Sequence, residues 1–253
     1  MNIQYASDLH LEFPENREYL RKNPILASGE ILILAGDIIP FGLIDRGREF
    51  FDKISADFKE VYWVPGNHEY YYDDITDHYG VLHEQIRENV YLVNNVWIEK
   101  DGCELIFSTM WSNISAQNQW RIANGMADFQ VIKYNGQAFS PAHFNKLHFQ
   151  SLEFLSRALS RVKRKTRIVA THHVPTLINY PPKYKGDILT EAFAVELADF
   201  IAANSPDYWI SGHHHYNHGG FNIVDTQMLT NQLGYVRYGE QLGYRDDAFI
   251  DLG

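Results

Sequence analysis

Short apolar runs separated by polar stretches recur along the whole chain, and each run has the length of a buried strand. Glycine, asparagine and aspartate bound many of them, as expected at strand ends. The Asp101-Gly102 dipeptide is a strong hairpin signal, so the runs on either side of it are expected to pair antiparallel. The pattern predicts strands at residues 3–7, 31–35, 60–64, 90–93, 96–99, 104–108, 167–170, 208–211, 221–224, 228–230 and 249–252.

Other parts of the chain repeat their core-facing positions at helical spacing. The clearest predicted helix covers residues 141–162, where Ser140 is a suitable N-cap and Pro141 suits the first helical position. Further helices are predicted at residues 191–203 and 42–58. The core-facing positions of the first helix are Phe144, Leu147, Ser151, Leu155, Ala158 and Val162.

This order of elements indicates an α/β fold. Strands alternate with helices toward both ends of the chain and form hairpins in the middle, which suggests two sheets packed face to face with helices outside. The chain has 253 residues, of which 45% are hydrophobic, enough for one large buried core. No repeat or linker interrupts the pattern, so we expect a single domain over residues 1–253.

Composition narrows the function classes. The single cysteine, Cys103, excludes an internal disulfide and fits a reducing compartment. The chain begins with a predicted strand and has no apolar run near the roughly 18 residues of a membrane span, so we expect a cytoplasmic protein. The net charge of -10 argues against nucleic acid as a partner. The one dense basic stretch, residues 161–167, is interpreted as the solvated end of a helix.

Five predicted strands end in residue types that bind metals. In α/β sheets, ligands bind at the carboxyl ends of strands. In extended chain, residues two apart point the same way, so Asp8 and His10 should face one point. By the same argument His213 and His215 should face one point, with His214 directed away. The residues at the five strand ends are Asp8 and His10; Asp37; Asn67 and His68; His172 and His173; and His213, His214 and His215.

The chemistry of this set favours a pair of transition metals. Carboxylate, imidazole and amide oxygen without thiolate suit Mn, Fe or Zn. The ligands are too many for one ion, whereas two ions roughly 3.5–4 Å apart that share a carboxylate would use them all. With only two carboxylates in the set, the ions would keep an excess of positive charge, which attracts phosphate and lowers the pKa of a bridging water.

These motifs resemble those of the calcineurin-like metallophosphoesterase superfamily, and more closely those of bacterial phosphohydrolases of unassigned substrate. The closer resemblance includes "STMWSN", "ADF" around Asp128, "THHVP" and "NQLGY". Asn113 and Gln232 depart from the usual residues, and neither is expected to touch the metal core. The superfamily motifs are Asp8-Leu9-His10, Gly36-Asp37, Gly66-Asn67-His68-Glu69, His172 and Gly212-His213-His214-His215.

The resemblance implies a four-layer α/β/β/α sandwich and a role for each motif residue. His68 would be the general acid or a transition-state stabiliser. His172 is preferred over His173 as a ligand because it is the first residue past its strand, which leaves His173 and His214 beside the site or facing substrate. One ion would be held by Asp8, His10, Asp37 and His215, and the second by Asp37, Asn67, His172 and His213, with Asp37 as the bridge.

The expected function is a hydrolase acting on phosphomonoester or phosphodiester bonds of a small substrate, for which a nucleotide is one candidate, by attack of a metal-bridging hydroxide. A nuclease of the same superfamily and a catalytically silent scaffold are the alternatives. The acidic charge argues against the nuclease, and the complete ligand set against the scaffold. Asp45-Arg46-Gly47 begins eight residues after Asp37, further than the protein serine/threonine phosphatase branch requires.

Overall fold

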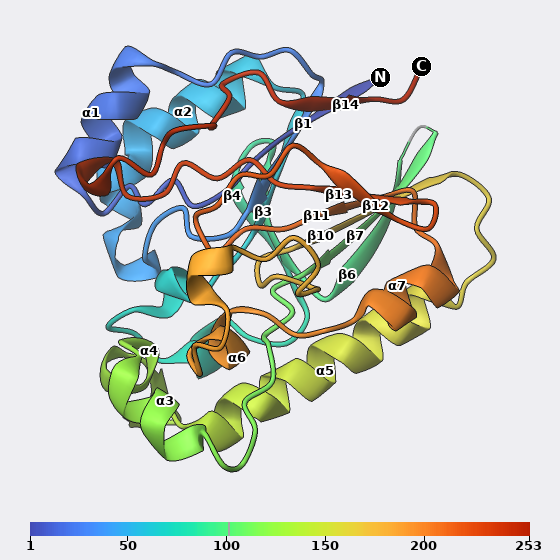
Figure 1. The fold of residues 1–253 in the computed structure, drawn as a ribbon. Helices are drawn as coiled ribbons and strands as arrows, with labels where there is room; N and C mark the ends of the chain where they lie inside the picture. The colour runs from blue at the N-terminus through green and yellow to red at the C-terminus, as the bar shows by residue number, and fades with distance from the viewer. Residues whose placement is uncertain (101) are drawn as a thin grey trace.

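The computed structural model describes residues 1–100 and 102–253, and two six-stranded sheets form its centre (Figure 1). The first sheet has the order β14 (Phe249–Asp251), β1 (Asn2–Ala6), β2 (Ile31–Ala35), β3 (Glu60–Val64), β5 (Val90–Asn94) and β4 (Leu82–Arg87). The second has the order β12 (Phe221–Ile223), β13 (Thr226–Leu229), β11 (Tyr208–Ile210), β10 (Thr166–Thr171), β7 (Cys103–Ser108) and β6 (Val96–Lys100).

Inner neighbours run parallel in both sheets, and the edge strands β14, β4, β12 and β6 run antiparallel. The parallel strands bring several carboxyl ends to one side of the molecule. All eleven predicted strands are present with small displacements of their ends. The predicted antiparallel pairing of β6 with β7 is confirmed, although Asp101 of the turn lies outside the described residues.

Successive side chains along each strand point to opposite faces of its sheet. One face packs against the other sheet, and the opposite face packs against helices. On the first sheet, Ile31 and Ile33 face the second sheet and share a buried cluster with Leu105, Phe107 and other residues of its strands. The intervening residues face outward and pack against helices. This division between inner and outer faces is what two stacked sheets require.

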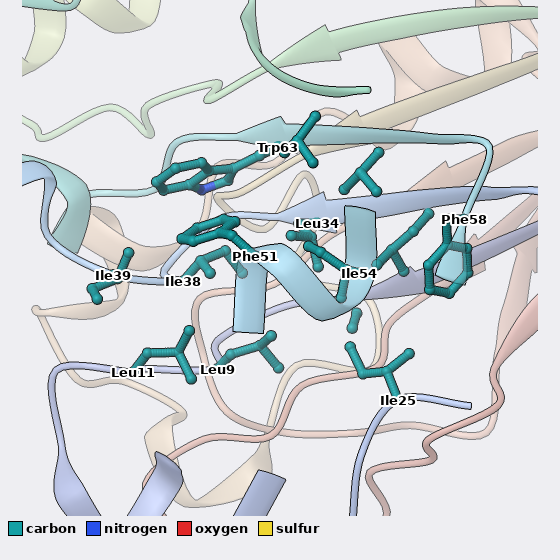
Figure 2. Close-up of a cluster of buried hydrophobic side chains, with 14 of the residues drawn as sticks. Leu9, Leu11, Ile25, Leu34, Ile38, Ile39, Phe51, Ile54, Phe58 and Trp63 are labelled. Atoms are coloured by element: carbon teal, nitrogen blue, oxygen red, sulfur yellow. The ribbon is translucent and has the colours of Figure 1, made fainter. Parts of the chain in front are cut away.

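Helices cover the outer face of each sheet. On the first sheet, α2 (Arg48–Asp57) buries Phe51 and Ile54 against Leu34 and Trp63 (Figure 2). α1 (Pro14–Lys22) adds Leu20 to the same buried cluster. On the second, α5 (Pro141–Leu159) and α7 (Ala198–Asn204) pack on Val169 and Trp209. The predicted α/β/β/α sandwich is confirmed. Within the described residues, no helix combines the length and apolarity needed to cross a bilayer.

Shorter elements complete the chain. α3, α4 and α6 lie beside the sandwich, near the start of α5 (Figure 1). A two-stranded hairpin packs next to α4. These elements are α3 (Gln119–Gly125), α4 (Asp128–Val131), α6 (Thr190–Phe193), β8 (Lys133–Tyr134), β9 (Gln137–Ala138), and the 3-10 turns η1 (Phe41–Gly47), η2 (His68–Tyr70), η3 (Ile75–Asp77), η4 (Pro182–Tyr184) and η5 (Val236–Tyr238).

Two helix predictions were wrong in part. The helix predicted at 141–162 ends at Leu159, and Val162 is exposed rather than core-facing. The helix predicted at 191–203 is broken into α6 and α7, because the chain between them pairs with the backbone of Val174. The basic stretch is also not wholly solvated, since Arg167 is buried in β10 and pairs with Glu104 at 2.7 Å.

Candidate metal centre

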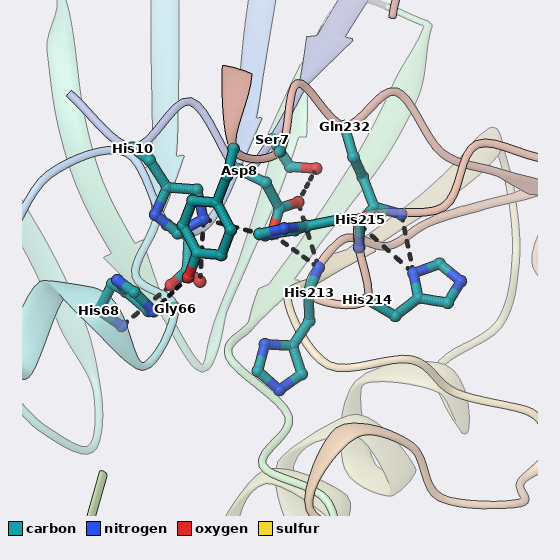
Figure 3. A network of polar contacts seen from close by, with 12 residues as sticks. Ser7, Asp8, His10, Gly66, His68, His213, His214, His215 and Gln232 are labelled. Atoms are coloured by element: carbon teal, nitrogen blue, oxygen red, sulfur yellow. Dashed lines mark hydrogen bonds and ion pairs between the residues drawn. The ribbon is translucent and has the colours of Figure 1, made fainter. Parts of the chain in front are cut away.

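The predicted site residues come together at the carboxyl ends of the inner strands. Asp8 and His10 follow β1, Asp37 follows β2, Asn67 and His68 follow β3, His172 follows β10, and the three-histidine run follows β11. Figure 3 shows side chains from both halves of the chain converging there. Three of them, Asp8, His10 and His172, are completely buried, so this is an interior polar cluster that opens toward one cleft.

One group of ligand-type atoms involves Asp8, His10 and His215. The Nε2 atoms of His10 and His215 are 3.0 Å apart, and the latter is 3.4 Å from Asp8 Oδ1. A carboxylate oxygen of Asp37, Oδ2, lies 3.8 Å from His10 Nε2. Two imidazole nitrogens and two carboxylates therefore face a common point.

The other group involves Asp37, His172 and His213. His172 Nε2 lies 3.0 Å from His213 Nδ1, 3.2 Å from Asn67 Oδ1 and 3.4 Å from Asp37 Oδ1. Its other nitrogen, Nδ1, is 3.0 Å from the carbonyl oxygen of Ala35, to which it can donate. Asp37 thus presents one oxygen to each group of atoms.

The donor set and its spacing fit transition-metal ions. At metal–nitrogen distances of about 2.0–2.1 Å, adjacent ligands lie roughly 3.0 Å apart in an octahedron and 3.4 Å apart in a tetrahedron. The atom pairs above have separations of 3.0 to 3.4 Å within each group, apart from the longer Asp37–His10 contact. Imidazole and carboxylate donors at this spacing suit Mn, Fe or Zn.

Two carboxylates that sequence reasoning missed lie behind the histidines. Glu12 Oε1 is 3.0 Å from His10 Nδ1, and Glu240 Oε2 is 2.6 Å from His215 Nδ1. A carboxylate at Nδ1 holds the proton there and leaves Nε2 free to bind a metal. Glu12 follows His10 by two residues and could have been suspected from that spacing, whereas nothing in the sequence links Glu240 to the site.

Burial and neighbouring carboxylates act in opposite directions on the histidines of the site. Burial and nearby histidines lower the pKa of His10 and His213, whereas carboxylates raise that of His172 and His215. Burial alone would lower the pKa of His172, but the carboxylate of Asp37 outweighs it and raises that pKa to about 9. For His215, burial is likewise outweighed by hydrogen bonds to Asp8 and Glu240, which raise its pKa to about 10. The carboxylates that favour the charged form of these two rings also attract metal cations.

Five of the seven candidate ligands have a left-handed backbone, which is uncommon for residues other than glycine. Their φ angles are +55° for Asp8, +47° for His10, +57° for Asp37, +78° for His213 and +47° for His215. Such conformations cost on the order of 1–3 kcal/mol each and persist where the surroundings fix them. Here backbone hydrogen bonds join the loops, from Asp8 to Gly36, and from His10 to Asp37.

This backbone corrects the argument from extended spacing. Asp8 and His10 do share a group of atoms, but they reach it from left-handed turns rather than from extended chain. The prediction that His213 and His215 face one point was wrong, because each joins a different group. In Figure 3 the rings of the three consecutive histidines point in different directions.

Gly66 allows the loops to approach one another closely. A Cβ atom at this position would overlap the Asp37 carboxylate and lie 2.7 Å from His172 Nε2. Any side chain there would therefore occupy the space on which Asp37 and His172 converge. Position 66, directly before the candidate ligand Asn67, must therefore be glycine.

Glu69, the last residue of the Gly66-Asn67-His68-Glu69 motif, ties two of the loops together, a role that the sequence did not predict. Its buried carboxylate accepts hydrogen bonds from the backbone N–H groups of Asp37 at 3.0 Å, Ile38 at 2.7 Å and Gly66 at 2.6 Å. The indole N–H of Trp63 donates to it at 3.0 Å. One side chain thus fixes the turn after β2 against the turn after β3.

Replacement of Glu69 by alanine is expected to lower the free energy of unfolding by at least about 3 kcal/mol, because each of four buried donors left without an acceptor costs about 1–3 kcal/mol. Urea denaturation measures this. Glu153→Ala, at an exposed position of α5, is the matched control and should change stability by no more than about 0.5 kcal/mol. A loss below about 1 kcal/mol for Glu69→Ala would contradict the structural role.

His68 lies at the edge of the cleft, beside the candidate ligands. Its Nδ1 is 2.9 Å from Glu12 Oε1, the oxygen that also faces His10, and its Nε2 is 3.3 Å from the Tyr235 hydroxyl. The ring stacks on Tyr71 with centroids 4.1 Å apart. His10, Glu12 and His68 also lie close enough together to resemble a metal site. Their proximity is explained by hydrogen bonds, because the Nδ1–H groups of both histidines donate to the same oxygen of Glu12.

The remaining predicted residues have different surroundings. His173 is completely buried against Trp111 and Phe144, so it does not line the cleft. His214 does line it. Gln232, which was not expected to touch the metal core, accepts a hydrogen bond from the backbone N–H of His215 at 2.7 Å and lies 2.9 Å from His214 Nδ1.

Comparisons with known proteins agree with this architecture. The family model of calcineurin-like phosphoesterases matches residues 1–217, a range that contains every candidate ligand. An uncharacterized protein of Acanthamoeba polyphaga mimivirus is 32% identical over 281 aligned residues, which cover 99% of this chain and 96% of that protein. The phosphopantetheinyl hydrolase of Mycobacterium tuberculosis has a similar fold, with a TM-score of 0.68 and 15% identity over 93% of this chain and 90% of that chain.

Proposed function

Since the chain belongs to the calcineurin-like phosphoesterase family and is therefore a metal-dependent hydrolase of phosphoester bonds, we propose that it hydrolyses small phosphoesters at a pair of transition-metal ions. The observation that carries the proposal is the position of Asp37, whose two oxygens face two different groups of ligand atoms. A carboxylate shared in this way is the usual bridge between paired ions. A single domain over residues 1–253 is part of the proposal, supported by the core that both sheets share.

We assign the ligands of the two ions from the two groups of atoms. His172 is preferred over His173 because its Nε2 faces three other candidate ligand atoms, whereas the ring of His173 packs among aromatic side chains. His213 would bind through Nδ1, and His10 and His215 through Nε2. The first ion would be held by Asp8, His10, Asp37 and His215, and the second by Asp37, Asn67, His172 and His213.

When bound, the ions would supply an activated water for attack on phosphorus and positive charge beside the phosphoryl oxygens. The protein contributes the leaving-group side of the reaction. Glu12 holds His68 by its Nδ1, so that the Nε2 of the same ring faces the cleft and Tyr235. A ring fixed in this way can donate a hydrogen bond or a proton to the leaving oxygen of the substrate. Burial opposes a charged ring, but the carboxylates of Asp37 and Glu12 outweigh it and raise the pKa of His68.

Metal-dependent hydrolysis of nitrophenyl phosphate and bis(nitrophenyl) phosphate tests the proposal. After chelation, activity should be absent, and it should return when Mn, Fe or Zn is added. The ratio of the two rates separates a monoesterase from a diesterase. No metal-restored hydrolysis of either compound would overturn the proposed function, and degradation of single-stranded DNA at a comparable rate would favour a nuclease.

A further inference from the structure

A cleft of about 330 Å³ opens beside the candidate metal centre and has the size of a small-molecule site. Asp37, His68, His213 and His215 lie at its base. Its walls come from α4, the loop before α6 and the loop around Tyr235. A phosphoryl group bound at the base would therefore direct the organic part of its ester toward these walls.

The walls are rich in aromatic rings. The ring of Tyr71 stacks on His68, and that of Tyr180 on His214 with centroids 5.6 Å apart. These rings and their neighbours offer flat apolar faces with hydroxyl groups at their edges, which suits a planar organic group. The aromatic residues that line the cleft are Tyr71, Tyr180, Tyr184, Phe193 and Tyr235.

The charged groups of the walls all have one sign. Asp128, Asp187 and Glu240 line the cleft, and among the described lining residues none is lysine or arginine. Asp128 is 1% exposed, and its Oδ2 accepts a hydrogen bond from the Tyr71 hydroxyl at 3.1 Å. Its Oδ1 has no hydrogen-bond partner among the residues that the structure describes. A buried carboxylate oxygen without a partner can accept a hydrogen bond from a ligand or from a water.

We propose that this cleft selects phosphoesters with a single phosphoryl group attached to a planar ring that is uncharged or cationic, and that it discriminates against a second phosphate. This inference rests on the proposed function of the same site. The phosphoryl group would be neutralised at the base of the cleft, whereas a second phosphate would lie beside three acidic side chains and no lining lysine or arginine. The Nζ of Lys183, which is not a lining residue, lies 4.6 Å from the ring centroid of Tyr184. Repulsion between like charges in a partly enclosed cleft weakens binding severalfold for each pair of charges.

Binding of non-hydrolysable phosphonates to the metal-loaded protein tests the inference by calorimetry, independently of catalysis. Phenylphosphonate should bind at least about tenfold more tightly than methylphosphonate, because of ring burial. It should also bind at least about tenfold more tightly than 1,4-benzenediphosphonate, because of the second anion. A 4-(aminomethyl) substituent on phenylphosphonate should maintain or increase affinity. Equal binding of the phenyl and methyl compounds, or of the phenyl compound and the diphosphonate, would overturn the inference.

Two variants connect the selectivity to the acidic walls. Asp128→Asn and Asp187→Asn should each reduce the preference for phenylphosphonate over the diphosphonate by about fivefold. Asp225→Asn changes the net charge equally, but lies in the turn between β12 and β13 at the other end of the sheet, and should leave the preference unchanged. An unchanged preference in both cleft variants would contradict the role of the acidic walls.

Hydrolysis of nitrophenyl phosphate by the same preparation separates the two proposals. Metal-dependent hydrolysis without ring or charge selectivity in phosphonate binding would overturn this inference and leave the proposed function standing. Absence of both hydrolysis and phosphonate binding would overturn the proposed function, and the inference with it.

Discussion

Replacement of Asp37 by alanine is expected to abolish phosphoester hydrolysis and to remove both metal ions. Asp37 Oδ1 faces the ligand atoms of His172 and Oδ2 faces those of His10, and these belong to the two different ion sites. The loss of Asp37 therefore removes one ligand from each site. It would also leave the repulsion between two neighbouring cations unscreened. Metal content of the purified variant and its rate on nitrophenyl phosphate measure the two effects, and the rate should fall to the background of the assay.

His10→Ala is the control, because His10 is assigned to only one of the two ions, together with Asp8 and His215. This variant should chiefly weaken one ion and retain the other. Asp37 also accepts a hydrogen bond from the backbone N–H of His68, which the alanine variant loses. Circular dichroism therefore has to show that both variants are folded. If His10→Ala emptied both sites and Asp37→Ala emptied only one, the assignment of Asp37 as the bridge would be wrong.

Replacement of His68 by alanine is expected to lower activity by roughly 10²–10⁴-fold, the usual contribution of a general acid or base, while both metal ions remain bound. The side chain lies outside both groups of candidate ligand atoms, and its ring is fixed by Glu12 and Tyr71 at the edge of the cleft. The loss should be larger for an alkyl phosphate than for nitrophenyl phosphate, because nitrophenolate leaves without needing a proton.

His83→Ala, at an exposed position of β4, is the matched control and should keep full activity. Equal losses on the alkyl and nitrophenyl substrates after His68→Ala would reject the general-acid role and favour charge stabilisation. A metal ion lost together with His68 would make this residue a ligand.

Sequence patterns predicted the strands well because their apolar runs are bounded by clear turn residues and remain buried on both faces, as Leu32 and Ile33 do in β2. The helix predictions failed where tertiary contacts override local spacing. The break between α6 and α7 depends on pairing with Val174, which is distant in sequence. The start of α1 has no side-chain cap on Phe13, and the helix was missed for lack of that signal.

The motifs also indicated which residues would gather at the site, because every one of them follows a parallel strand. They could not indicate how the site is held. Glu240 contacts His215 from a distant loop. Glu69 joins two turns by accepting hydrogen bonds from backbone N–H groups, which nearly every residue type has and which therefore leave no sequence signal. The left-handed turns at Asp8 and Asp37 were missed because aspartate gives only a weak signal for that conformation.

The number of metal ions bound per chain tests the central claim most directly. The protein would be stripped with chelator, saturated in turn with Mn, Fe and Zn, freed of excess metal by gel filtration and analysed by mass spectrometry of the elements. Two groups of ligand atoms that share Asp37 predict close to two ions per chain with at least one of these metals. A stoichiometry of one or less with all three would contradict the paired-metal site.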